Sequence, residues 1–188
     1  MYTLPARGIS DIPVIETDRL ILRAARNEDY QPTFDMWQMD EYVRFAGNRR
    51  KSSGEVWTDL QSKIGAWGLF GFGYLMFEHR ETGKVIGSGG FTLSRRSEMS
   101  PSLPMIPEAG WGIAPEYWGQ GYTGEAMRGV LNWMREQDPQ FPAQCIIDPG
   151  NTASERIALR LGFEKKGDRI MYDKVINWYE LTRPGTDT

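Results

Sequence analysis

A glycine-rich hexapeptide at residues 119–124 (GQGYTG) is the feature that most constrains this 188-residue chain. It follows a short apolar pattern at 109–114 that predicts a strand, and it precedes an apolar stripe with helical spacing that runs to Gln137. A glycine loop between a strand and a helix presents backbone N–H groups at the positive end of the helix dipole. The hexapeptide therefore predicts a site for a phosphorylated ligand.

The same letters fit the G-x-G-x-x-G pattern of dinucleotide-binding folds. That pattern belongs in the first βαβ unit, with an acidic residue about 20 positions on at the end of the next strand. Here several strands precede the loop, and the corresponding region, residues 138–142 (DPQFP), lies ahead of the next strand. The context disfavours a dinucleotide enzyme, which is kept as an alternative together with glycines that serve only a tight turn.

Hydrophobic periodicity places the remaining elements around this loop. A turn at 80–83 joins two strands into a hairpin, residues 94–107 form an unusually long loop, and 152–155 (TASE) fits a capping box before a helix that Gly162 ends. We expect strands at 20–22, 74–78, 85–93, 109–114, 144–147, 163–168 and 174–181, and helices at 30–37, 53–64, from the loop to 137, and from 152.

Composition and charge exclude several classes of protein. Hydrophobic residues make up 40% of the chain, yet no apolar run approaches the roughly 20 residues that span a bilayer, and no secretory signal is visible. A net charge of −3 and a pI near 5.3 argue against nucleic acid as a partner. A single cysteine, Cys145, fits a reducing compartment, so we expect a cytoplasmic protein.

Residues 118–123 resemble the (Arg/Gln)-x-x-Gly-x-(Gly/Ala) signature with which Gcn5-related N-acetyltransferases (GNAT) hold the pyrophosphate of coenzyme A. Trp118 and Thr123 depart from this signature, although tryptophan is common at the first position in the branch of ribosomal-protein N-terminal acetyltransferases. Other segments resemble that branch in the same order: 16–23 (ETDRLILR), 86–90 (IGSGG), 125–126 (EA), 151–154 (NTAS) and 161–163 (LGF).

The resemblance implies an α/β (α+β) fold with a mixed, mostly antiparallel twisted sheet of about six to seven strands and about four flanking helices. We expect an N-terminal arm at 1–17 and a single domain at 18–183. The implied activity is acetyl transfer from acetyl-CoA to a primary amine by direct attack in a ternary complex. A small molecule or a protein N-terminus would serve as the acceptor, no metal is needed, and a homodimer is compatible with the family. A non-catalytic acyl-CoA-binding module is the remaining alternative.

In the family, a bulge splays the strand before the loop from its neighbour, and the opened backbone binds pantetheine. Gly112 suits such a bulge, although a plain edge strand is an alternative. The residues expected to bind the cofactor are Trp111, Gly112, Ile113, Trp118, Gly119, Gln120, Gly121, Tyr122, Thr123, Gly124, Asn151 and Ser154.

Two side chains are candidates for proton transfer. Glu108 begins the strand before the loop, where some relatives carry a general base, and a solvated glutamate is the alternative. Many relatives carry a tyrosine as the acid at the position of Ala158; here Ser154, one helical turn earlier, lies on the same face and could protonate the thiolate. A capping hydroxyl is the alternative role for Ser154.

The remaining reactive residues receive no catalytic role. His79 is expected to be solvated beside its turn, and Cys145 to be part of the core. One histidine and one cysteine cannot build an ordinary metal cluster. The basic run 49–51 is expected on a solvated face, where it could meet an acidic acceptor or the adenosine 3′-phosphate. The acceptor itself is expected to contact the variable segments 37–72 and 94–107.

Overall fold

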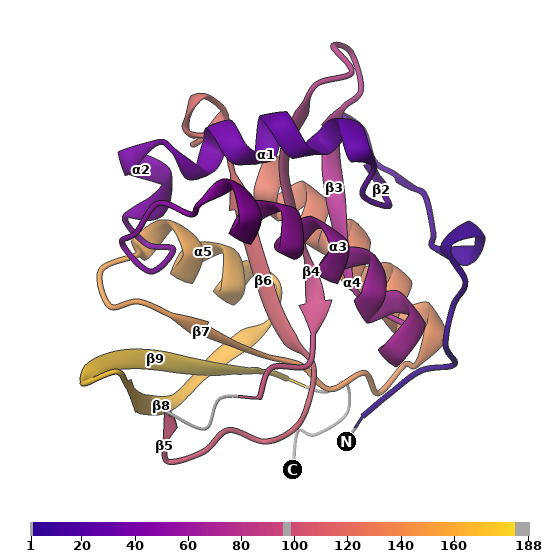
Figure 1. Ribbon diagram of the computed structural model, residues 1–188. Helices are drawn as coiled ribbons and strands as arrows, with labels where there is room; N and C mark the ends of the chain where they lie inside the picture. The colour runs from indigo at the N-terminus through magenta and orange to yellow at the C-terminus, as the bar shows by residue number, and fades with distance from the viewer. Residues whose placement is uncertain (1, 96–98, 183–188) are drawn as a thin grey trace.

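The computed structural model describes residues 2–95 and 99–182. The end of the predicted domain at residue 183 and part of the predicted loop 94–107 lie outside the described residues. One mixed sheet runs through the described ranges in the order β1-β2-β3-β4-β6-β7-β9-β8-β5 (Figure 1), and among these strands only β6 and β7 pair in parallel. The strands are β1 (Ile15–Glu16), β2 (Leu20–Arg23), β3 (Tyr74–His79), β4 (Val85–Thr92), β5 (Met99–Ser100), β6 (Glu108–Ile113), β7 (Gln144–Ile147), β8 (Phe163–Met171) and β9 (Lys174–Leu181).

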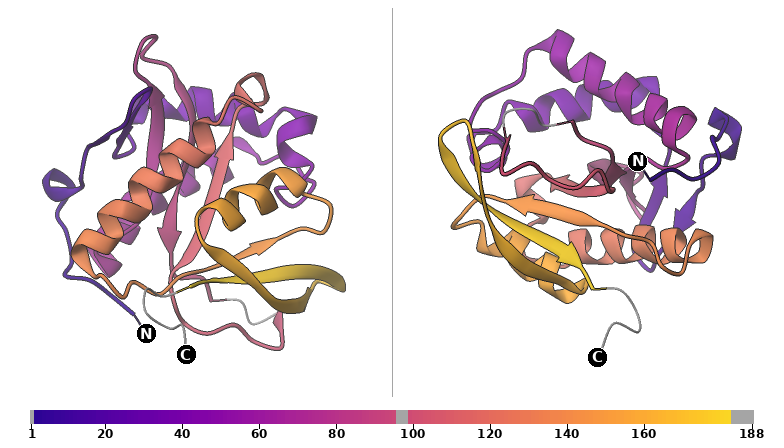
Figure 2. Two further views of the ribbon diagram at one scale, coloured as in Figure 1. Left: turned by 180° about the vertical axis from the view of Figure 1, so that it is seen from behind. Right: turned by 90° about the horizontal axis from the view of Figure 1, so that it is seen from below.

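Helices cover both faces of the sheet. One face carries α1 (Tyr30–Trp37), α2 (Asp40–Val43) and α3 (Ser53–Phe70), and the other carries α4 (Tyr122–Gln137) and α5 (Thr152–Arg160), as the front and back views show (Figures 1 and 2). The apolar stripe of α4 is buried against the sheet as predicted, through Ala126, Met127, Val130, Leu131 and Met134. The predicted α+β class with a mostly antiparallel mixed sheet is confirmed. None of the helices in the described ranges is long and apolar enough to cross a membrane.

The described part of the chain forms nine strands, where six or seven were predicted. It forms five α-helices, where four were predicted. The additional elements, β1, β5 and α2, have two to four residues each, too few to show a period in the sequence. β1 lies in the segment 1–17 that was expected to be an N-terminal arm, and β5 lies in the expected loop 94–107. These short elements extend the two sheet edges and the helical layer without changing the class.

Helix α3 is six residues longer than the predicted helix 53–64. Ala66 and Trp67 continue its buried face, and the N–H groups of Leu4 and Arg7 donate to carbonyls in its last turn. Tertiary packing thus outweighs the low helix propensity of the glycines in this stretch. Trp57 in the first turns of this helix is 42% exposed and packs on Tyr30.

Candidate functional site

The glycine loop turns directly into α4. Gly119 and Gly121 have φ angles of +73° and +83°, a left-handed conformation that side chains rarely adopt, and Gly121 is the N-cap of the helix. Glu125 makes the first helical bond, from its N–H to the Gly121 carbonyl at 3.1 Å. The N–H groups of residues 122–124 therefore precede the first helical hydrogen bond. The helix was expected to start after Gly124, but it starts at Tyr122.

The backbone of this loop is accessible to a ligand at its glycines. A Cβ atom built on Gly119 or Gly124 would contact nothing within 4 Å, so the loop surface is open there. Tyr122 and Thr123 are buried in the protein. The amide of Gln120 donates to the Glu116 carbonyl at 2.9 Å. An open surface of amides at a helix N-terminus fits a phosphate group.

Three side chains that sequence reasoning did not select hold this loop in place. Glu125 accepts from the Thr17 hydroxyl at 2.6 Å and from the guanidinium of Arg19 at 2.7 Å. Arg19 also donates to the Gln120 carbonyl at 3.0 Å and lies 4.1 Å from the Tyr122 ring centroid. The signal was present in the matched segments 16–23 and 125–126, which the fold brings together.

His79 also belongs to this region. Its Nε2 lies 3.0 Å from the Tyr122 hydroxyl and its Nδ1 lies 3.1 Å from the Thr82 hydroxyl, and its side chain is half-buried. The expectation of a solvated histidine is therefore wrong. The Tyr122 ring on the first turn of α4 reaches back to the β3–β4 hairpin and gives His79 a partner.

Strands β6 and β7 separate immediately after they meet. They share one bridge, between Glu108 and Gln144, although β6 continues to Ile113. On its other side β6 pairs with β4 without a register shift. Gly112 therefore makes no bulge against β4, and the predicted splaying of β6 arises from its divergence from β7.

The diverging stretch has backbone groups that point into the gap. Ala114 donates its N–H to Ile86 at 2.8 Å, so alternation along the antiparallel ladder turns the N–H and C=O groups of Trp111 and Ile113 away from β4. At the far end of the gap, the Trp118 indole donates to the Ile113 carbonyl at 2.8 Å. The open edge of β6 thus leads directly to the glycine loop, and Trp118 remains 46% exposed there.

A pocket of about 1390 Å³ lies in front of β6, on the side of α1 to α3. Glycines at 110 and 112 make room for tyrosines over the strand: a Cβ on Gly110 would clash with the Tyr74 hydroxyl, and one on Gly112 with the Tyr42 hydroxyl. Burial, with a further contribution from Asp59, raises the pKa of Tyr42 to about 12, so its hydroxyl is neutral at physiological pH. Residues 108, 110 and 112 share this face of β6.

Glu108 lies at the base of the pocket. It is 7% exposed, pairs with Thr92 on β4 and Gln144 on β7, and lines the pocket. It is therefore buried rather than solvated, at the point where the two strands begin to diverge.

Ser154 lies behind β6. Its hydroxyl oxygen accepts a hydrogen bond from the Trp111 indole at 3.3 Å. Its N–H donates to Asn151 Oδ1 at 3.2 Å, which makes Asn151 the N-cap of α5 and corrects the expected capping box that began at Thr152. Ala158 is fully buried one turn later. The structure thus brings Trp111, Asn151 and Ser154 together on one side of the gap.

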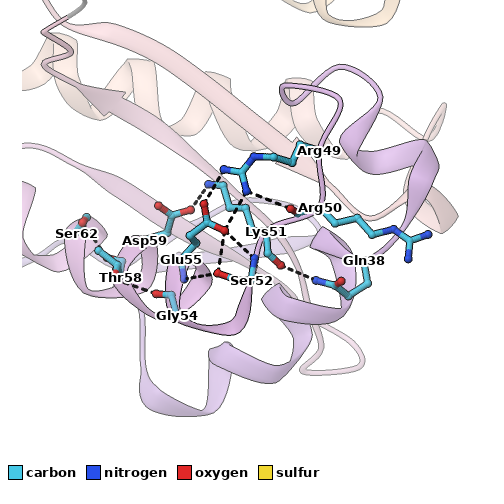
Figure 3. A network of polar contacts seen from close by, with 10 residues as sticks. All are labelled: Gln38, Arg49, Arg50, Lys51, Ser52, Gly54, Glu55, Thr58, Asp59 and Ser62. Carbon is cyan, nitrogen blue, oxygen red and sulfur yellow. Dashed lines mark hydrogen bonds and ion pairs between the residues drawn. The ribbon is translucent and has the colours of Figure 1, made fainter.

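Cys145 is buried in the core as predicted, and this burial, with a contribution from Glu108, raises the pKa of its thiol. Within residues 2–95 and 99–182 no group of three or more His, Cys, Asp or Glu side chains could hold a metal ion. The basic run 49–51 forms ion pairs with acidic side chains of its own region. Arg49 pairs with Glu55 and Lys51 with Asp59 (Figure 3), and Arg50 pairs with Asp40.

Comparison with known proteins identifies the family. The model of the acetyltransferase (GNAT) domain matches residues 19–164. The chain is 29% identical to the uncharacterized N-acetyltransferase YoaA of Bacillus subtilis, over 92% of this chain and 98% of that protein.

Solved structures share the fold. A structure from Bordetella pertussis, named as a GnaT-family acetyltransferase, superposes with a TM-score of 0.79 and 26% identity, covering 90% of this chain and 99% of that one. The ribosomal-protein-S5-alanine acetyltransferase of Vibrio fischeri superposes with a TM-score of 0.69, over 94% of this chain and all of that one, but at 15% identity it shows the fold alone. The family match spans most of the chain, so this protein belongs to the acetyltransferase (GNAT) domain family of acetyl-CoA-dependent N-acetyltransferases.

Proposed function

We propose that this enzyme transfers the acetyl group of acetyl-CoA to a primary amine by direct attack, with both substrates bound at once. The observation that carries the proposal is the gap between β6 and β7, which leads to the glycine loop at one end and has Glu108 and the pocket at the other. Such a gap lets a thioester and an amine approach from opposite sides of β6. Holding two reactants in this way removes much of the entropic cost of their encounter.

The residues present fit coenzyme A. Backbone amides of residues 119–124 would hold the pyrophosphate, because the loop surface is open at Gly119 and Gly124 and the loop lies at the N-terminus of α4. The N–H and C=O groups of Trp111 and the N–H of Ile113, which point into the gap, would pair with the amide groups of pantetheine, as a further strand would. The Ile113 carbonyl already accepts from Trp118. Asn151, whose Oδ1 is occupied by capping, retains its amide N–H groups as donors.

Glu108 and Ser154 would divide the proton transfers. The amine nitrogen attacks the thioester carbonyl carbon, the C–S bond breaks, and the thiolate of coenzyme A leaves. An ammonium group with a pKa of about 10 must first lose a proton, which Glu108 would take directly or through water. Ser154 accepts from Trp111, so its own O–H can donate to the departing thiolate, whose pKa is about 8.5.

Several finer assignments remain proposals. The acceptor is a small-molecule amine or a protein N-terminus, and likeness to the ribosomal-protein branch rests on the matched sequence segments. A cytoplasmic location, the division into an arm at 1–17 and a domain at 18–183, and a homodimer stay predictions.

An acceptor panel tests the proposal most directly. The purified protein with acetyl-CoA should release free thiol in the presence of at least one amine, and product mass should rise by one acetyl group. Coenzyme A should also raise the melting temperature, whereas NAD should not. Stabilisation by coenzyme A without thiol release on any amine would favour the non-catalytic binding module. Stabilisation by NAD alone would favour the dinucleotide enzyme.

A further inference from the structure

The wall of the pocket formed by α3 and by the segment just before it carries two lysines in different electrostatic situations. Lys51 and Lys63 both line the pocket, together with Asp59. The charge of Lys51 is compensated, because its ammonium forms an ion pair with Asp59 (Figure 3). It also lies 3.9 Å from the Trp37 ring centroid. The carboxylate of Asp59 therefore already has an ion-pair partner in Lys51.

Lys63 lies one helical turn after Asp59, on the same face of α3. It is half-buried, and no carboxylate within the described ranges forms an ion pair with it. Its Nζ lies 5.7 Å from the centroid of the Tyr74 ring. Burial lowers the pKa of Lys63; Asp59 opposes this shift and Lys51 adds to it. Removing a lysine from water in this way is unfavourable unless an anion compensates it.

Tyr74 connects this lysine to the proposed reaction centre. Its ring faces Lys63, and its hydroxyl lies over Gly110, two residues from Glu108 on the same face of β6. The pocket therefore carries a carboxylate at β6 and an ammonium group at α3. Such a pair of opposite charges is complementary to a molecule that has an amine at one end and an anion at the other.

We propose that Lys63 binds an anionic group of the acceptor, so that the acceptor is an amine that also carries a carboxylate or a similar anion. This inference rests on the proposed function, because it assumes that the amine is acetylated near Glu108. The anion could belong to a free amino acid or to an acidic side chain near a peptide N-terminus, and both present the same chemistry to Lys63.

Binding of acetylated products tests the inference without turnover. Calorimetry would compare N-acetyl-L-alanine with N-acetyl-L-alaninamide, and acetyl-Ser-Glu-Ala-amide with acetyl-Ser-Gln-Ala-amide, on the protein saturated with coenzyme A. The anionic member of at least one pair should bind about tenfold to a hundredfold more tightly, as expected for a hydrogen bond between charged groups. The pair that shows the preference identifies the source of the anion.

Substitutions assign the preference to Lys63. Lys63→Met should abolish it and Lys63→Arg should retain it, while Lys84→Met, an exposed lysine outside the pocket, should leave it unchanged. Equal binding within both pairs, or a preference that survives in Lys63→Met, would overturn the inference. Acetylation of Lys63 itself, seen by peptide mass analysis after incubation with acetyl-CoA, would also overturn it. Failure of the proposed function is distinguishable, since it appears as missing thiol release with either class of amine.

Discussion

The guanidinium of Arg19 and the carboxylate of Glu125 form an ion pair of 2.6 Å, although the two residues are 106 positions apart. Arg19 leads into the edge of β2, and Glu125 lies in the first turn of α4 beside the glycine loop. Because Arg19 also donates to the Gln120 carbonyl, the pair fixes the loop to the sheet edge. We infer that this pair positions the loop amides for phosphate without touching the ligand.

Glu125→Gln should therefore destabilise the protein and weaken coenzyme A binding a few-fold. Burial alone would raise the pKa of Glu125, but hydrogen bonds from Thr17 and Arg19 outweigh it and hold the pKa below its usual value. A depressed pKa contributes stability above the unfolded value of about 4.3, and this contribution is lost as pH falls through the folded pKa. Urea unfolding should show a deficit of about 1–2 kcal/mol at pH 7 that shrinks below about pH 4. The exposed Glu81→Gln is the control, and an equal deficit in both variants would contradict the argument.

Gly124→Glu should separate coenzyme A binding from stability. Gly124 lies in the first turn of α4, where a new Cβ meets nothing and a carboxylate is favourable to the helix, so stability should rise by up to about 1 kcal/mol. The added negative charge beside the pyrophosphate should weaken coenzyme A binding by about tenfold to a hundredfold. Gly54→Glu is the matched control, because Gly54 has the same open surroundings in the first turn of α3. Unchanged affinity in calorimetry would place the cofactor elsewhere.

Glu108→Gln should lower turnover most at low pH. Without the carboxylate, reaction depends on amine that is already neutral, and the fraction of neutral amine grows as pH rises towards a pKa of about 10. A pH–rate profile with an acceptor from the panel should therefore show a loss at pH 6 that partly recovers by pH 9. A loss of the same size at all pH values would mean that Glu108 does not take the proton.

Ser154→Ala should lower turnover without that recovery. The thiolate would then have to take its proton from water. Because water partly replaces the missing acid, turnover should fall by about tenfold to a thousandfold, somewhat less than the full contribution of general acid catalysis. Coenzyme A affinity should change little, since backbone amides hold the pyrophosphate. Ser154→Thr keeps a hydroxyl and should retain more activity than Ser154→Ala. Wild-type turnover in Ser154→Ala would show that proximity alone drives transfer.

Local sequence patterns predicted most helices and strands, because the hydrophobic periodicity of such an element depends only on consecutive residues. The stripe on α4, the hairpin around Gly83 and the strand 144–147 are of this kind, and each is found at or near its expected place. The glycine loop was located as well, since positive φ angles at a strand-to-helix turn require glycine.

Features made by distant residues could not be predicted in this way. The partners of His79 and the extra turns of α3 depend on segments that meet only in the folded chain. The separation of β6 from β7 is likewise absent from the sequence of either strand, and the resemblance to a family supplied it. Lys63 was not selected, because its lack of an ion-pair partner within the described ranges depends on contacts that form only in the folded chain.

The close fit of Gly110 beneath Tyr74 and of Gly112 beneath Tyr42 has a consequence for how this chain can evolve. Neither glycine can acquire a side chain while its tyrosine keeps its place, and a smaller residue at 42 or 74 would open the floor of the pocket. The two members of each pair are therefore expected to coevolve, so that a substitution in one is accompanied by a compensating change in the other. Covariation at 42 with 112, and at 74 with 110, would record past changes of acceptor.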